Sequence, residues 1–276
     1  TGQALERARR GFLISLARAF GGALFFSLPL LMTMEMWEQG FTISPLRLAL
    51  FLLLAIPVLT GLSWYSGFEP TETLKDDLVD AFVAYSIGFC VAAIVLFLFA
   101  VITLKLSLLA VVGIVSLHAV PASIGALLAQ SQFGIQPTTE QQKKEDTGYG
   151  GELFLMVAGA IYLSLSLAPT DEVVLIGYKM TVWHALGIIV VSLIVMHAFM
   201  YSLQFRGQDA LPTDTSALSL FVRFTVVGYA LALLVSYYIL WTFGRTDGLS
   251  FYQNLMNAIV LAFPAAIGAA AARLIL

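Results

Sequence analysis

Eight stretches of roughly 20 predominantly apolar residues follow one another along the chain, and they constrain its fold more than any other feature. A helix needs about 20 such residues to cross the hydrocarbon core of a bilayer. Lipid offers no partners for backbone polar groups, so each crossing segment must satisfy its own hydrogen bonds as a helix. The sequence therefore predicts an all-α polytopic membrane protein with about eight transmembrane helices. The predicted spans are 13–34, 46–67, 79–103, 107–130, 152–169, 183–203, 217–243 and 251–275.

The composition agrees with lipid as the main solvent of this chain. Hydrophobic residues make up 59% of it and charged residues only 11%, whereas a soluble domain has roughly 25% charged residues. The net charge of −3 argues against a nucleic-acid partner. No nucleophile constellation, P-loop or dinucleotide fingerprint is present, so we expect neither an enzyme nor a bound metal or cofactor.

A polar segment at 131–150, "SQFGIQPTTEQQKKEDTGYG", divides the chain nearly in half. It predicts an N-terminal four-span part at 1–130 and a C-terminal four-span part at 151–276. With the N-terminus in the cytoplasm, the inner side holds ten Lys and Arg residues and the outer side four. This bias predicts that both termini are cytoplasmic.

The two halves repeat each other. "AVPASIGALLA" (119–129) matches "AFPAAIGAAAA" (262–272) at an offset of 143, and "GALFFSLPLLMTME" (22–35) matches "GAIYLSLSLAPTDE" (159–172) at an offset of 137. Each half has an even number of spans, so both copies enter the membrane from the same side. The pattern predicts two parallel four-helix repeats related by a pseudo-two-fold axis along the membrane normal.

The repeated helices carry small residues at helical spacing, together with Pro121 and Gly125 in one copy and Pro264 and Gly268 in the other. Small faces allow close helix approach in lipid, and each proline removes a backbone donor and displaces a carbonyl. Two interpretations remain open: kinked packing helices, or helices that line a hydrated or ion-conducting path near the pseudo-axis.

Several polar residues lie in or near the spans, where charges are costly and indicate function. Glu35 and Glu172 occupy equivalent positions near the predicted outer ends of spans one and five, accompanied by Ser27 and Ser164. Paired carboxylates at a mouth can concentrate cations or relay protons. The alternative is that both glutamates are solvated helix ends.

Asp80 and Arg223 are equivalent at the offset of 143 and lie near predicted inner span ends, where they can pair across the pseudo-axis or snorkel separately. Asn254 and Asn257 lie in span eight, opposite Val111 and Ile114 of the first half. One-sided polarity is typical of a specialised site, although hydrogen bonding between helices is the commoner reason for such residues.

His118 and His197 are candidates for haem or pigment ligation, because a bound macrocycle needs an axial ligand. No CxxCH motif or histidine pair at i, i+4 supports that role. We therefore expect both histidines to act as buried hydrogen-bonding groups.

The N-terminal "RARRGFLISLARAFGGALFFSLPLLMTMEMWE" and the "HAVPASIGA" span resemble an uncharacterised bacterial family of single-domain integral membrane proteins of unknown function. The resemblance implies a bacterial inner-membrane location. It implies no catalytic or binding residue.

These patterns favour a channel or transporter for an ion or small solute, with a path near the interface of the two repeats. The alternative is a non-transporting structural or accessory subunit, and an intramembrane enzyme ranks third. The expected partners are the lipid bilayer and either further copies of the chain or other membrane subunits.

Overall fold

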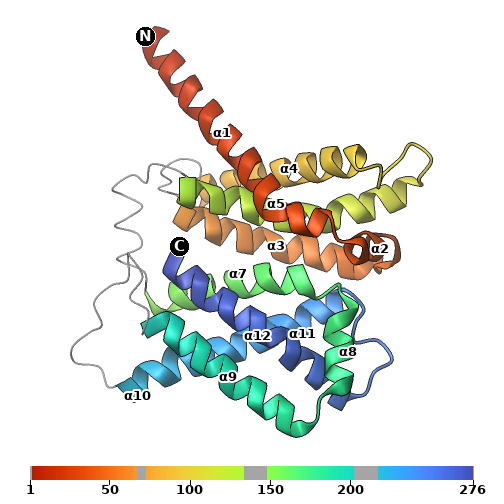
Figure 1. Ribbon diagram of the computed structural model, residues 1–276. Helices are drawn as coiled ribbons and strands as arrows, with labels where there is room; N and C mark the ends of the chain where they lie inside the picture. The colour runs from red at the N-terminus through yellow and green to blue at the C-terminus, as the bar shows by residue number, and fades with distance from the viewer. Residues whose placement is uncertain (1, 67–72, 134–147, 202–216, 276) are drawn as a thin grey trace. The chain divides into compact units, whose positions relative to one another are not determined.

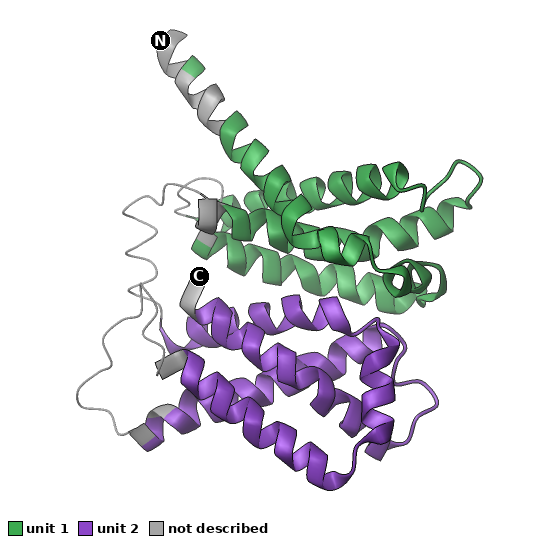
Figure 2. Ribbon diagram, viewed as in Figure 1, with its two compact units in different colours: residues 1–146 green, residues 147–276 purple. Residues whose placement is uncertain are grey.

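The computed structural model describes residues 2–66, 73–133, 148–201 and 217–275 as helices joined by short turns (Figure 1). The chain forms two compact units, unit 1 over Thr1–Asp146 and unit 2 over Thr147–Leu276 (Figure 2). Their boundary falls within the polar segment 131–150.

Eight helices of the described residues are long and apolar enough to cross a membrane, and these residues contain no strand. The predicted all-helical, multi-span fold is therefore confirmed. The third span begins at Leu74 rather than at 79 because Thr73 caps the helix. The Thr73 hydroxyl accepts a hydrogen bond from the Asp76 backbone N–H, and the Asp76 carboxylate accepts one from the Thr73 N–H. The span helices run over 13–31, 45–65, 74–98, 108–129, 149–167, 182–199, 221–242 and 251–273.

Each unit contains a long helix, a short helix and three further long spans in the same order. Unit 1 contains α1 (Gly2–Leu31), α2 (Met34–Thr42), α3 (Pro45–Ser66), α4 (Leu74–Leu98) and α5 (Leu108–Phe133). Unit 2 contains α7 (Tyr149–Leu167), α8 (Asp171–Lys179), α9 (Val182–Tyr201), α10 (Ala217–Leu220), the π-helix η1 (Phe221–Val226), α11 (Val227–Thr242) and α12 (Phe251–Ile275). A symmetry axis relating the two units stays a prediction.

The last helix of each unit is its centre. In unit 1, α5 packs against α1, α2, α3 and α4; in unit 2, α12 packs against α7, α8, α9 and α11. The membrane-spanning parts of α5 and α12 are 72% and 67% buried, whereas the other spans are 17–50% buried. Their polar side chains are therefore shielded from lipid by the unit's own helices.

Close backbone contacts attach each central helix to the first helix of its unit. A Cβ atom built on Gly22 of α1 would lie 2.0 Å from the Ala129 Cβ and 2.7 Å from the Gly125 carbonyl oxygen of α5. In unit 2, a Cβ on Gly159 of α7 would lie 2.1 Å from the Gly268 carbonyl oxygen of α12. Such approach increases van der Waals contact, which drives helix association in lipid.

The short helices α2 and α8 begin after Thr33 and Thr170, whose extended backbones break the preceding spans. With nine residues each, they are too short to cross a bilayer. Gly40 of α2 and Gly177 of α8 are buried, and a Cβ on either would collide with the central helix of its unit. These helices therefore cap one end of each unit through close contact with α5 or α12.

We predict that Gly22→Ala and Gly159→Ala each lower the free energy of unfolding by about 1–3 kcal/mol, because the added methyl group overpacks a backbone contact. Denaturant-induced unfolding in detergent micelles measures the change. Gly21→Ala is the matched control, since a Cβ at Gly21 meets no atom within 4 Å. Equal losses for Gly21→Ala and Gly22→Ala would contradict the assigned contact.

Candidate functional site

Glu35 and Glu172 lie one turn beyond the spans rather than at their ends. Both occupy the first turn of a short helix, α2 for Glu35 and α8 for Glu172. A carboxylate is favourable there because the helix N-terminus carries partial positive charge. Glu35 is half-buried and Glu172 is exposed. Both glutamates thus lie near the span ends, within the short helices that follow them, and their pathway role stays a prediction.

Ser27 and Ser164 are both fully buried, but their hydroxyls have different surroundings. Ser27 of α1 donates a hydrogen bond to the Ala23 carbonyl one turn earlier. Ser164 of α7 has no hydrogen-bond partner in the structure. The unit 2 serine thus retains an unused polar group at membrane depth.

Asp80 and Arg223 lie in different units, so the predicted ion pair between them stays a prediction, as does the path near the repeat interface. Asp80 is half-buried in α4. Arg223 is exposed in η1, and its guanidinium carbon lies 4.8 Å from the centre of the Tyr149 ring. The Tyr149 hydroxyl donates a 2.8 Å hydrogen bond to the Arg223 carbonyl. Cation–π attraction therefore holds this arginine against α7.

The prolines of the repeated helices do not interrupt them. α5 continues through Pro121 and α12 through Pro264. Gly125 and Gly268 are the residues at which these helices meet α1 and α7. Close packing is therefore observed at these glycines, and the lining of a path stays a prediction.

Both histidines are engaged in hydrogen bonds. The fully buried His118 places Nδ1 2.8 Å from the Ile114 carbonyl oxygen; because a carbonyl only accepts, Nδ1 carries the proton. The His197 Nδ1 lies 3.0 Å from the Thr225 hydroxyl of η1. Ligation of a haem or pigment by either residue gains no support from these contacts.

The first turns of α12 bring three amide side chains together. Gln253, Asn254 and Asn257 are 8%, 7% and 1% exposed. The Gln253 Nε2 donates to the Asn257 Oδ1 at 2.9 Å, within one helix, whereas the sequence favoured bonds between helices. The Asn254 Oδ1 and the Asn257 Nδ2 are buried without a partner. Together with Gly177 of α8, which faces Asn257, these residues form what we call the amide cluster.

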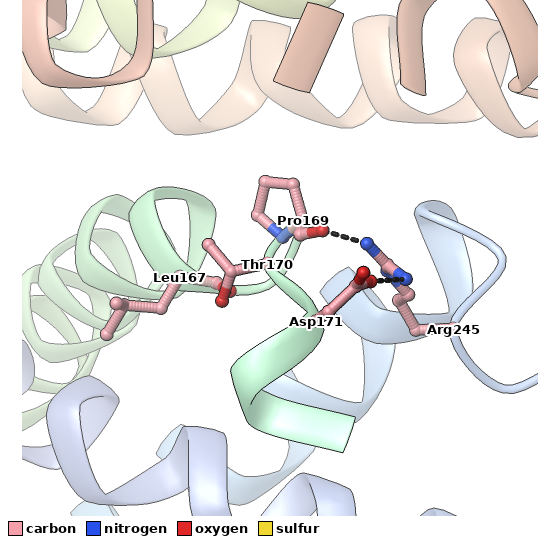
Figure 3. Close-up of polar contacts among 5 residues, drawn as sticks. All are labelled: Leu167, Pro169, Thr170, Asp171 and Arg245. Carbon is pink, nitrogen blue, oxygen red and sulfur yellow. Dashed lines mark hydrogen bonds and ion pairs between the residues drawn. The ribbon is translucent and has the colours of Figure 1, made fainter. Parts of the chain in front are cut away.

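An arginine joins two turns of unit 2 that are far apart in sequence (Figure 3). The Arg245 Nη1 donates to the Asp171 carboxylate at 2.6 Å, and the Arg245 Nη2 donates to the Pro169 carbonyl. The Arg245 side chain is 20% exposed and that of Asp171 is 80% exposed. Sequence reasoning placed Arg245 only in the count of outer charges, because 74 residues separate the partners.

A second ion pair lies at the other end of α7. The Arg273 Nε of α12 lies 2.7 Å from the Glu152 carboxylate, with 21% and 25% of the two side chains exposed. The Arg273 guanidinium also stacks 4.3 Å from the centre of the Phe224 ring. Sequence reasoning missed this pair too, although Glu152 opens the predicted fifth span and Arg273 nearly closes the eighth.

The described residues contain no group of three or more His, Cys, Asp or Glu side chains able to hold a metal ion. The polar groups found instead are amides, hydroxyls and paired charges.

Comparison with known proteins gives a family match over nearly the whole chain. A family model described as "Putative integral membrane protein (DUF2391)" matches residues 15–276. The match confirms the predicted resemblance to an integral membrane protein family. No curated protein and no solved structure matches the chain.

We predict that Arg245→Gln destabilises unit 2 more than Asp171→Asn. Asp171→Asn weakens only an exposed pair worth about 0–1 kcal/mol, whereas Arg245→Gln also removes the donor to the Pro169 carbonyl. Hydrogen–deuterium exchange of the turns at 168–171 and 243–250 measures the loss as faster exchange. Lys105→Gln, an exposed lysine of unit 1, is the control, and equal effects of Arg245→Gln and Asp171→Asn would contradict the Pro169 contact.

For the second pair, we predict that Arg273→Gln lowers the free energy of unfolding by about 1–3 kcal/mol, because it leaves the Glu152 carboxylate without its cation. Adding Glu152→Ser restores part of the loss. The double variant carries the residues of the first half at these positions, Ser15 and Gln130. A double-mutant cycle in detergent measures the coupling, and additive losses would show that the two side chains do not interact.

Proposed function

The chain belongs to this family of integral membrane proteins, and we propose that it is a channel or transporter for an ion or small solute. One observation carries the proposal: membrane-spanning helices of unit 2 hold buried polar groups without partners. They include the Asn254 Oδ1, the Asn257 Nδ2 and the Ser164 hydroxyl, together with the Tyr229 and Tyr238 hydroxyls of α11. In unit 1, the Ser63 hydroxyl and the His118 Nε2 are buried without a partner as well.

Such groups are costly in a structure that serves packing alone. An unpaired buried amide or hydroxyl costs roughly 1–3 kcal/mol by mutational measurement in proteins. Polar groups within membrane spans commonly mark substrate or ion pathways. Groups left open inside a shielded helix bundle therefore favour a bound or passing polar ligand.

Glu35 and Glu172 are the proposed outer polar groups, and Asp80 and Arg223 the proposed inner ones. Glu35 and Glu172 both lie in short helices outside the membrane-spanning helices, where a carboxylate does not have to be buried in hydrocarbon. Fixed negative charge at a mouth raises the local cation concentration. We propose a bacterial cytoplasmic membrane location from the family resemblance, and cytoplasmic termini from the Lys and Arg distribution.

The proposal includes descent of the two units from one duplicated four-span ancestor. Two sets of contacts support it. Gly22 meets Gly125 as Gly159 meets Gly268, at positions that the offsets 137 and 143 pair with each other. Gly40 meets Ile114 as Gly177 meets Asn257, at the same two offsets.

An accessory role is the competing function, and the outer face of α9 favours it. This helix is the least buried of the eight spans. Large apolar side chains cover it, and they fit a partner helix as well as lipid. The exposed residues include Val182, Trp183, Leu186, Val190, Val191 and Ile194.

Flux measurements in proteoliposomes test the proposal. We expect the wild-type protein to carry at least one probe among Na⁺, K⁺, Cl⁻, glycerol and urea above the rate of protein-free vesicles. If a cation passes, Glu35→Gln with Glu172→Gln lowers its flux several-fold at low salt and less at high salt, because screening weakens the carboxylate field.

The matched control is Glu38→Gln, which removes an exposed carboxylate of α2 one turn away. An equal loss of cation flux in this control would remove the special role of Glu35. Failure of the wild-type protein to carry any of the five probes would overturn the transport function and favour the accessory role.

A further inference from the structure

The amide cluster holds one unused hydrogen-bond acceptor and one unused donor. The Asn254 Nδ2 faces the Thr246 carbonyl oxygen at 3.4 Å, which orients this amide because a carbonyl only accepts. The Asn257 Oδ1 accepts from Gln253. The Asn254 Oδ1 and the Asn257 Nδ2 then remain, three residues apart on α12 and both buried.

The close contact between α8 and α12 does not itself require amides. A Cβ on Gly177 would lie 2.0 Å from the Asn257 Oδ1 and 3.2 Å from the Gln253 Nε2, so the glycine leaves the space that the amides occupy. In unit 1, a Cβ on Gly40 of α2 would lie 2.6 Å from the fully buried Ile114 of α5, which is also too close for a side chain. An apolar residue is therefore sufficient for packing against the short helix in unit 1. Packing alone does not explain why unit 2 has the polar Asn257 at the aligned position.

The free groups determine the class of ligand. The three amides carry no charge, and hard cations take about six or more oxygen ligands. A single free amide oxygen beside a free N–H donor cannot supply such a shell, and the N–H repels a cation. An anion would be repelled by the partial negative charge of the free Asn254 Oδ1. A neutral molecule that both donates and accepts a hydrogen bond satisfies both groups at once.

We propose that the amide cluster between α8 and α12 binds a small uncharged solute bearing a hydroxyl or amide group. This inference rests on the proposed transport function and specifies its substrate class. The solute accepts from the Asn257 Nδ2 and donates to the Asn254 Oδ1, so it replaces the partners that these buried groups lack.

Stopped-flow light scattering on proteoliposomes tests the proposal with glycerol and urea as probes and with K⁺ and Cl⁻ flux measured in parallel. We expect Asn254→Val with Asn257→Ile, the residues of the first half at these positions, to lower glycerol or urea flux by at least about tenfold. The loss of two hydrogen bonds accounts for a change of this size.

Gly177→Ala and Gly40→Ala form the second comparison, because both overpack a contact between a short helix and a central helix. Only Gly177→Ala displaces an amide, so we expect it to lower neutral-solute flux at least about fivefold more than Gly40→Ala. Size-exclusion chromatography of each variant confirms that the comparison is made between folded proteins.

Ion flux without neutral-solute flux would overturn the inference and leave the proposed function standing. The inference would also be overturned if the double variant Asn254→Val, Asn257→Ile left glycerol and urea flux unchanged. Equal losses of neutral-solute flux in Gly177→Ala and Gly40→Ala would overturn it too. Absence of flux for all four probes would count against the transport function itself.

Discussion

The contact between glycine backbones of the first and last helix of each unit is the interaction on which the rest of the fold depends. Gly22 meets Gly125 in unit 1, and Gly159 meets Gly268 in unit 2. Lipid provides no hydrophobic drive for helices to associate, so close surface complementarity has to hold them together. A side chain at any of these positions would force the central helix away from its neighbour.

A helix held in this way is surrounded by its own unit, and this changes which side chains it can carry. α5 and α12 contact four other helices each, so much of their surface never meets lipid. The fully buried His118 on α5 and the amide cluster on α12 depend on this shielding. Polar residues on the exposed face of an outer helix such as α9 would instead face hydrocarbon at a cost of several kcal/mol.

Hydropathy and length predict the spans well, because both follow directly from the thickness of the bilayer. The short helices α2 and α8 escaped prediction because nine residues leave no hydropathy signal distinct from the neighbouring span. Thr33 and Thr170 mark their starts, and a search for capping residues is the local signal that could have found them.

Contacts between residues far apart in the sequence were harder to predict from the sequence. Arg245 reaches Asp171 across 74 residues and Arg273 reaches Glu152 across 121, and no local pattern links either pair. The alignment of the two halves offers an indirect signal for these ion pairs. It places the four charged residues opposite the uncharged Ile102, Met34, Gln130 and Ser15. Unit 2 thus has an ion pair near each end of α7, and amides on α12, where the aligned positions of the first half carry uncharged or apolar residues. The glycine contacts are alike in the two units, whereas these charged and amide side chains occur at the aligned positions of unit 2 alone.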